Sequence, residues 1–207
     1  NEPLRSELYE LRKKRPQPSA DTKIITSWNC LLGVAFCYVE KFTSINTNAD
    51  VLYREVIKQG KFHTTNNGSE QNNYFLEDAA SLLLLQTFLF ENSVVTAEQL
   101  NEQYEEVMRF KVNDKWVENP GSDFLNVEAQ KFDHPIPSTN SLVEWALMRY
   151  AILTDQETLD IDYSQPLNFD AHNFVALLER ENKFFKCEKM PNEKSPLTIF
   201  KKDPSNV

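Results

Sequence analysis

Residues 74–90 read YFLEDAASLLLLQTFLF, and this stretch decides the fold class. After the acidic pair Glu77 and Asp78, apolar residues occupy nearly every helical face rather than a single stripe. A helix that is apolar all round must be buried on most of its faces, so other helices have to surround it. The sequence therefore predicts an all-α domain with this helix near its centre.

The rest of the chain carries the periodicity of amphipathic helices. Residues 24–42 repeat apolar side chains at i, i+3, i+4 and i+7, with Asp21 or Thr22 as the expected N-cap, whereas residues 97–110 have one apolar stripe and face water. Only four Gly interrupt the chain, and most of the ten Pro fall between or after these segments. About seven helices are expected, at 4–15, 24–42, 49–58, 74–90, 97–110, 140–153 and 170–181.

The order of these helices indicates how they are arranged. Strongly buried helices alternate with helices that have one apolar face, which is typical of stacked helical hairpins, although an irregular bundle fits the periodicity equally well. We expect a single helical domain over 1–207, in which 155–207 form a helix followed by an irregular tail with a strand-like run at 197–200. Residues 111–137 predict a long ordered loop with short strands.

Three of the buried helices begin with a group of polar residues. If these helices are the inner members of an alternating antiparallel array, their N-termini point the same way and the polar groups meet at one mouth. Such a mouth is a binding site for a polar ligand, and it contains all the ligand-binding residues that we predict. They are Trp28 and Asn29, then Glu77 and Asp78, then Ser138, Asn140 and Ser141.

Composition and charge exclude several classes of function. The chain of 207 residues has a formal net charge of -9, so nucleic acid or an anionic membrane would meet repulsion. No apolar run reaches the length of a membrane span and no signal peptide is visible, which favours a cytoplasmic protein. The three cysteines, Cys30, Cys37 and Cys187, form no CxxC pair, so neither a disulfide framework nor zinc is indicated; we expect no metal, no cofactor and buried, reduced thiols at Cys30 and Cys37.

Three motifs in order resemble one known family. Residues 11–31 read LRKKRPQPSADTKIITSWNCL, residues 75–79 read FLEDA, and Asp133 is followed by PSTNS at 137–141. They resemble the arginine, lysine-arginine, proline, aspartate-aspartate-lysine and tryptophan-asparagine-glycine segment, the FLEDYA segment and the proline-serine-glycine-asparagine-serine segment of proteins related to spermatogenesis-associated protein 20. The resemblance covers roughly residues 8–153.

The resemblance implies an (α/α) toroid like that of the N-acylglucosamine 2-epimerase and six-hairpin glycosidase folds, preceded in full-length members by a thioredoxin-like domain. A closed ring of this kind needs six hairpins, so the chain resembles a partial or shortened toroid. An open edge would expose apolar surface. The implied partners are the missing thioredoxin-like or toroid portion, or a second copy bound as a homo-oligomer.

The chain departs from the family within the motifs themselves. Thr22 replaces the second aspartate, Cys30 the glycine after Trp28-Asn29, Ala79 the tyrosine after Asp78, and Thr139 the glycine before Asn140. Side chains now occupy positions where a backbone segment or a ligand would need to approach closely. We therefore predict a diverged, non-catalytic domain that binds a small, polar, sugar-like ligand or a partner domain.

The alternative hypothesis is an enzyme, namely a carbohydrate isomerase, epimerase or glycosidase that uses Glu77, Asp78 and His134 for proton transfer. Adjacent residues on a helix point about 100° apart, which predicts that Glu77 and Asp78 cannot both face one substrate atom squarely. A third hypothesis is an interaction scaffold without a pocket.

Each candidate residue also has a purely structural interpretation. Acidic residues in the first turn stabilise a helix without any ligand, and Ser141 with Glu144 has the spacing of a capping box. Trp28 lies on the apolar stripe and is expected in the core, while His134 is expected on a loop surface.

Overall fold

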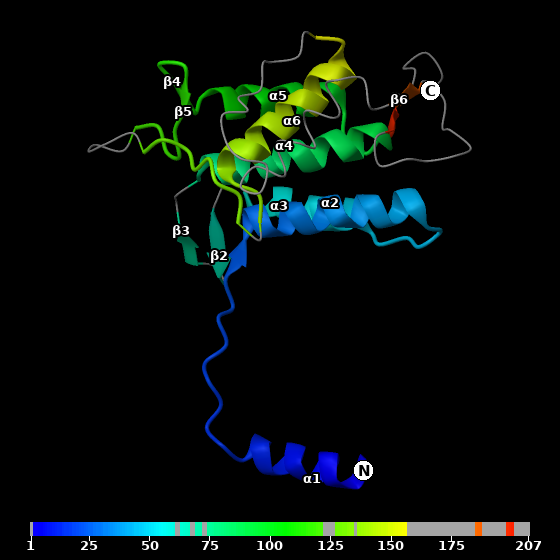
Figure 1. Ribbon diagram of the computed structural model, residues 1–207, viewed down its shortest axis with the longest axis vertical. Coiled ribbons are helices and arrows are strands. Elements are labelled where there is room, and N and C mark those ends of the chain that lie inside the picture. The colour runs from blue at the N-terminus through cyan, green and yellow to red at the C-terminus, as the bar shows by residue number, and fades with distance from the viewer. Residues whose placement is uncertain are drawn as a thin grey trace.

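A computed structural model of the chain describes residues 2–60, 63–66, 69–71, 74–121, 127–134, 136–156, 185–187 and 198–200. These residues are mostly helical (Figure 1). The helices are α1 (Glu2–Lys13), α2 (Thr26–Phe42), α3 (Ala49–Gln59), α4 (Leu76–Glu91), α5 (Ala97–Met108) and α6 (Thr139–Thr154). The strands are β1 (Ile24–Ile25), β2 (Thr64–Asn66), β3 (Ser69–Gln71), β4 (Lys111–Val112), β5 (Lys115–Trp116), β6 (Phe185–Cys187) and β7 (Thr198–Phe200).

The predicted helices are therefore found, apart from the one expected at 170–181, which lies outside the described residues. The loop at 111–137 contains the predicted short strands, since β4 and β5 form a hairpin whose turn residues Asn113 and Asp114 have φ angles of 51° and 60°. The strand-like run near the C-terminus is β7, which pairs in parallel with β6. Over the described residues, no helix has the length and apolar character needed to cross a membrane.

Helices α2, α4 and α6 run parallel to one another. The N–H of Ser27, in the first turn of α2, donates to Asp78 in the first turn of α4, while Arg149 near the end of α6 donates to Thr87 near the end of α4. Matching ends therefore lie side by side, as Figure 1 shows for α2 and α4. The first turns of the three inner helices accordingly lie at one end of the array.

Helices α3 and α5 run in the opposite direction. Gln86 near the end of α4 donates to Tyr53 in the first half of α3, and Gln103 in the second half of α5 donates to the carbonyl oxygen of Ala79 at the start of α4. The segment α2 to α6 is thus an alternating up and down array of helical hairpins, as the order of buried and one-faced helices predicts.

Burial follows the same alternation for α4 and α6 but not for α2. Nearly every residue of α4 and α6 is buried, whereas α2, α3 and α5 each bury one face, so the expectation that α2 is strongly buried is wrong. Helix α4 packs between α2 and α6, which explains why its sequence is apolar all round. Cys30 and Cys37 are free, buried thiols of α2, as expected, and desolvation by burial raises the pKa of each to about 12.

Two expected helix starts are wrong. Helix α2 begins after Ile25 rather than at Asp21 or Thr22, because Ile24 and Ile25 pair with β2 as a strand. Helix α6 is capped by Ser138, whose hydroxyl oxygen accepts the N–H of Ser141. Ser141 is therefore the residue whose amide is capped, and Ser138 is the N-cap. In both cases a tertiary or upstream hydrogen bond fixes the first turn.

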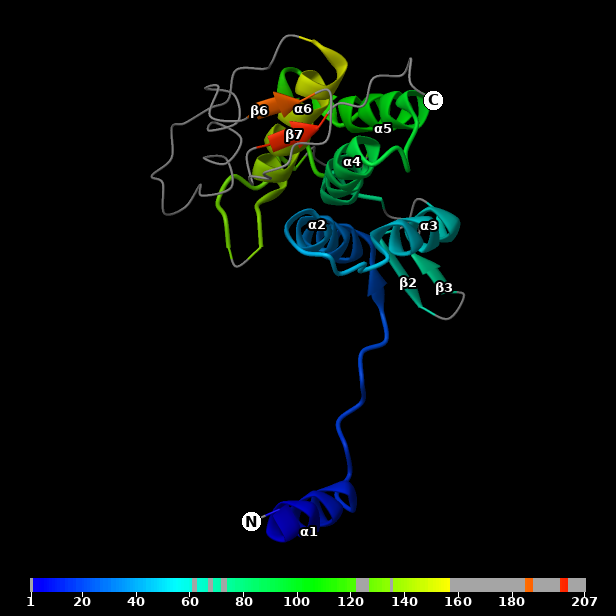
Figure 2. The ribbon, with the colours of Figure 1, turned by 90° about the vertical axis from the view of Figure 1, so that its right-hand side faces the viewer.

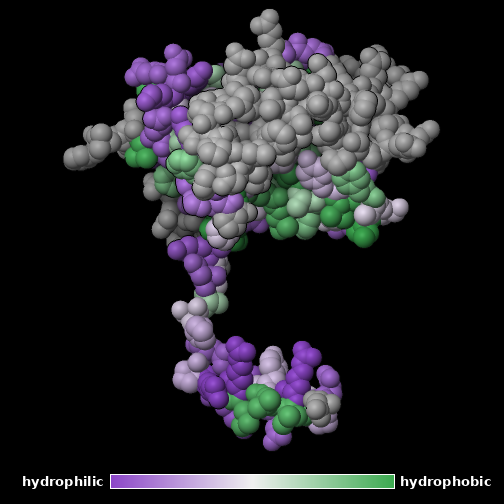
Figure 3. Space-filling view, viewed as in Figure 1, coloured by the Kyte–Doolittle hydropathy of each residue, from purple (hydrophilic) through white to green (hydrophobic). Residues whose placement is uncertain are grey.

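Two apolar faces, one on α1 and one on α2, are exposed to solvent. Helix α1 has no buried residue and stands apart from the array on an extended segment (Figures 1 and 2), with its leucine stripe exposed. The expected core position of Trp28 is also wrong, since this side chain is 58% exposed. It lies on an outer face of α2, and Figure 3 shows apolar surface gathered over α1 and on the array.

A buried ion pair joins α4 to α6. Arg149 is fully buried, donates to Glu91 and Thr87, and lies 3.7 Å from the ring centroid of Phe88. Lys41 of α2 is 3.9 Å from the other oxygen of Glu91. The pair therefore fixes the contact between the two most buried helices.

Replacing Arg149 by Met should lower the free energy of unfolding by about 3–5 kcal/mol, because Glu91 then keeps a buried charge without its closest partner. The double variant Arg149→Met, Glu91→Met should lose less than Arg149→Met alone, since no buried charge remains. Urea unfolding monitored by circular dichroism measures both, with Lys41→Met as a milder control. If the loss of unfolding free energy in the double variant equals the sum of the losses in Arg149→Met and Glu91→Met, the two side chains are not coupled and this account is wrong.

Candidate functional site

The carboxylate of Asp78 ties the starts of two helices together. Its side chain is fully buried, and its two oxygens accept the N–H of Ser27 at 3.1 Å and the N–H of Phe75 at 3.1 Å. Phe75 precedes α4, so Asp78 satisfies one of the free amides of its own helix start. Ser27 belongs to α2, so the same carboxylate also fixes the neighbouring helix. The structural interpretation of Asp78 as a cap is confirmed.

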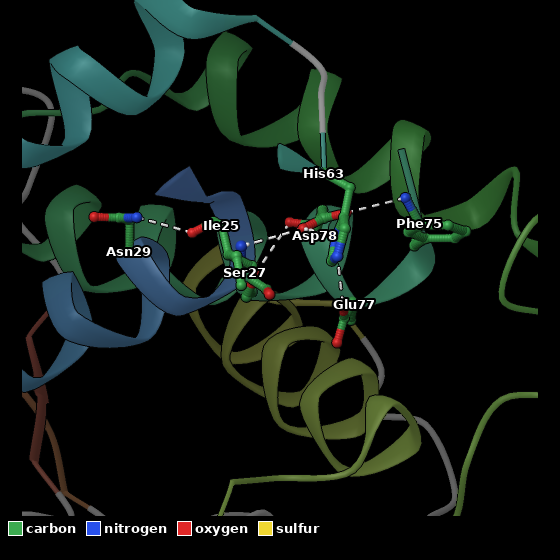
Figure 4. A network of polar contacts seen from close by, with 8 residues as sticks. Ile25, Ser27, Asn29, His63, Phe75, Glu77 and Asp78 are labelled. Atoms are coloured by element: carbon green, nitrogen blue, oxygen red, sulfur yellow. Dashed lines mark hydrogen bonds and ion pairs between the residues drawn. The ribbon is translucent and has the colours of Figure 1, made fainter. Parts of the chain in front are cut away.

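His63 completes the site from the segment between α3 and β2. Its carbonyl oxygen accepts the N–H of Thr26 at 3.0 Å, next to the pairing of β1 with β2. Its ring packs edge-on against Phe75, with 5.0 Å between the ring centroids. Nδ1 lies 2.9 Å from Oδ2 of Asp78 and 3.4 Å from Oε1 of Glu77 (Figure 4).

The expectation that Glu77 and Asp78 cannot both face one substrate atom squarely stays a prediction, but the two side chains do meet at one atom of the protein. Both carboxylates reach Nδ1 of His63, because the imidazole comes from another segment and lies over the first turn of α4. The sequence offered little to identify His63, since it stands in a segment with no strong periodicity and becomes a neighbour of α4 only through β-strand pairing. An imidazole and two carboxylates therefore lie together where only the two adjacent carboxylates were predicted.

Exposure separates the two carboxylates, whereas the direction of their pKa shifts is the same. Burial raises the pKa of Asp78, and the nearby His63 and the donors Phe75 and Ser27 oppose that rise. Burial and the neighbouring charge of Asp78 raise the pKa of Glu77, with a further contribution from Glu118. The side chains of His63 and Glu77 are 22% and 30% exposed, whereas Asp78 is covered by protein. Solvent therefore reaches His63 and Glu77 directly.

This geometry sets the proton positions. A neutral imidazole donates through Nδ1 to the carboxylate beside it, which leaves the lone pair on Nε2. The arrangement of a buried aspartate behind a partly exposed histidine is one that orients an acid or base. His63 Nε2 and the Glu77 carboxylate are thus the groups available for hydrogen bonding or proton transfer.

The other predicted residues serve the helix starts. Asn29 donates to the carbonyl oxygen of Ile25 at 2.8 Å, and Asn140 donates to Glu144 at 2.8 Å. Ser138 caps α6, and its own N–H is held by Asp133 at 2.8 Å. The third polar group lies at the same end of the array as the first two, and these hydrogen bonds keep its side chains on α6 and the loop before it.

Trp28 and His134 end up in exposed positions. Trp28 follows Ser27 directly, and its side chain is exposed on the outer face of α2. His134 lies on an exposed loop, as expected for a surface histidine. Within the described residues, the histidine that meets Glu77 and Asp78 is His63, which takes the place that the enzyme hypothesis gave to His134.

Comparisons with known proteins identify no relative. No family model matches the sequence, and a search of curated proteins finds no match. The likeness to proteins related to spermatogenesis-associated protein 20 stays a prediction, which rests on the three motifs alone.

Asp78→Asn should lower the free energy of unfolding by about 3 kcal/mol, because the amide presents N–H groups to the donors Ser27 or Phe75 and leaves His63 without its charged partner. Glu77→Gln is the matched control one residue away. It should change stability by less than about 1 kcal/mol, because Glu77 is partly exposed. Urea unfolding of both variants measures the difference. Equal losses would show that Asp78 does not hold the two helix starts together.

Proposed function

We propose that the shared N-terminal end of α2, α4 and α6 binds a small, polar, sugar-like ligand, in a diverged, non-catalytic domain built as part of an (α/α) toroid. The observation that carries this proposal is the convergence of two partly exposed groups, His63 and Glu77, on the buried carboxylate of Asp78. The Asp78 carboxylate is held by the N–H groups of Ser27 and Phe75, and His63 is held by the Thr26 N–H, which donates to its carbonyl oxygen. Such a site is preorganised and needs little ordering when a ligand binds.

The chemistry of these groups suits a polyhydroxylated molecule. Glu77 accepts hydrogen bonds from hydroxyl groups, and Nε2 of His63 accepts one more when Nδ1 holds the proton. Trp28 is exposed on the outer face of α2, so we assign it to the open edge described below rather than to contact with the ligand. Asn29 and Asn140 already bond within their own helices, so we assign them to the frame of the mouth rather than to direct contact.

The toroid is supported by the alternating array and remains part of the proposal. Helices α2 and α3 form one hairpin and α4 and α5 a second, with α6 as the inner member of a third. The polar first turns lie at one end, which is where a toroid of this type would open. Ring closure is not needed for the binding site, because its groups come from α4 and the segment before β2.

Ligand binding can be tested by thermal shift with a panel of monosaccharides and amino sugars at millimolar concentration. A ligand at about ten times its Kd stabilises the folded state by about 1.4 kcal/mol, which raises the Tm by about 4 °C. Glu77→Gln should abolish the shift, whereas the surface control His134→Ala should keep it. If no sugar shifts the wild-type Tm, the proposal is wrong.

Enzymatic proton transfer on the same ligand is the second candidate. The observation that favours it is the Asp78 carboxylate beside Nδ1 of His63, which would prepare Nε2 as a base, with the Glu77 carboxyl 3.4 Å from Nδ1 as an acid. Proton NMR of the same sugar panel distinguishes the two functions. Epimerised, isomerised or hydrolysed sugar that is absent with His63→Gln would establish the enzyme, and binding without turnover would leave the non-catalytic domain.

We also propose that the outer face of α2 is an open edge that binds a second copy of the chain. Trp28, Leu32, Val39 and Phe42 recur at intervals of one or two turns and are 58%, 45%, 38% and 46% exposed. The same chain carries a second unpaired apolar stripe on α1, formed by Leu4, Leu8 and Leu11. Both faces are already exposed, so a second copy could bury their apolar surface without any helix of the array having to move.

Light scattering coupled to size exclusion should give a mass above 24.1 kDa at micromolar concentration. Val39→Glu should return the mass to that of one chain, since it places a charge within the stripe, while Glu2→Gln, on the face of α1 opposite its leucine stripe, is the control. A wild-type protein that stays monomeric would exclude the second copy and leave the edge for a thioredoxin-like or further toroid portion.

A further inference from the structure

We infer that His63, Glu77 and Asp78 form a binding site for a divalent transition-metal ion of the zinc class. Among the described residues, these three side chains form the group of at least three potential ligands whose donor atoms lie within 4.8 Å of one another. One is an imidazole nitrogen and two are carboxylate oxygens, which is a donor set that zinc accepts. The motifs and the helix periodicity gave no indication of it, because the histidine comes from outside both.

The distances between the donor atoms fit a tetrahedral ion. With bonds of about 2.0–2.2 Å, two ligands of a tetrahedral zinc ion lie about 3.4 Å apart. Nδ1 of His63 is 3.4 Å from Oε1 of Glu77, which already has that separation. Nδ1 is 2.9 Å from Oδ2 of Asp78, so the ion would widen this contact by about half an ångström.

The site also has an ordered outer shell. The amides of Ser27 and Phe75 hold the carboxylate of Asp78 from behind, as outer hydrogen bonds hold ligands in metal sites. The hydroxyl of Ser27 is a second, independent observation. It belongs to a residue that is 2% exposed, lies beside Asp78 and finds no hydrogen-bond partner in the described structure. A metal-bound water would give this buried hydroxyl a partner.

Charge and access favour a cation over an anion. Glu77 and Asp78 are adjacent carboxylates, and Glu118 adds a third negative charge that acts on Glu77. The positive end of the α4 dipole opposes a cation, although Asp78 already accepts the Phe75 amide at this helix start. His63 and Glu77 are partly exposed, so an ion can enter and keep one coordination position open to solvent. Imidazole among the donors favours zinc over magnesium or calcium.

Metal binding would change the protonation of His63. The ion takes the place of the proton on Nδ1, and the neutral imidazole then carries its proton on Nε2. The inference goes beyond the proposed sugar-like ligand and does not depend on it. A hydroxyl oxygen of such a ligand could fill the open position, but the ion should bind without any ligand.

Isothermal titration calorimetry of the full chain with Zn²⁺, after treatment with EDTA and its removal, tests the site. One ion per chain is expected, and Glu77→Gln or His63→Gln should weaken binding at least tenfold while His134→Ala leaves it unchanged. Circular dichroism of each variant confirms that it is folded. The absorption of bound Co²⁺ should also lose its tetrahedral bands in Glu77→Gln.

The results that would overturn the inference are distinct from those that bear on the proposed function. No binding, or equal affinity in wild type, Glu77→Gln and His63→Gln, would show that zinc does not use this site. Thermal shifts with the sugar panel in EDTA report on the ligand without the ion, so a failed metal site would leave the sugar result standing and the reverse also holds.

Discussion

One buried carboxylate, that of Asp78, connects three separate parts of this chain. It accepts hydrogen bonds from the N–H of Ser27 at the start of α2, from the N–H of Phe75 before α4, and from Nδ1 of His63. A carboxylate out of contact with water is costly unless its oxygens are well satisfied. All three donors must therefore be in place together, which couples the pairing of β1 with β2 to the docking of α2 on α4.

The second constraint is the burial of α4 on nearly all sides. Because α2 and α6 cover it, its few polar side chains need partners from those helices and from the outer ones. Gln86 donates to Tyr53 of α3, and Thr87 with Glu91 accepts from Arg149 of α6. These contacts set the direction and register of the neighbours. The same packing that builds the core thus brings the polar first turns to one end of the array.

Periodicity carried enough information for the helices and little for their ends. Residues 97–110 and 140–153 are recognisable because a helix needs only its own apolar stripe to be identified. The start of α2 was missed because Ile24 and Ile25 satisfy the helical pattern equally well, and only their pairing with residues 64 and 65 makes them a strand. Trp28 was misplaced because an apolar stripe that faces solvent, as on α2, is indistinguishable in sequence from one that faces a core.

The candidate site shows a different limit. The sequence identified Glu77 and Asp78 because they interrupt an apolar run. The enzyme hypothesis paired them with His134, which stands next to Asp133 of the third motif, whereas the histidine in contact with them is His63. His63 reaches them through the hydrogen bond between its carbonyl oxygen and Thr26 and through the pairing of β1 with β2, which are contacts between distant parts of the sequence. Separation along a helix was also a poor guide, since an imidazole from another segment lies between two side chains that diverge from each other.

The two adjacent carboxylates consequently have different tasks. Asp78 is committed to the fold by its backbone donors, whereas the structure places Glu77 beside His63 with part of its surface open to solvent. A ligand from solvent would therefore meet His63 and Glu77 first, and the inferred ion would also bind Asp78. Nδ1 of His63 holds either a proton or the ion, but not both at once. With the proton there, Nε2 accepts a hydrogen bond from a hydroxyl group. With the ion there, Nε2 becomes a donor, and a hydroxyl oxygen would bind the ion itself at its open position. The same three residues thus permit two modes of recognition, and the occupant of Nδ1 selects between them.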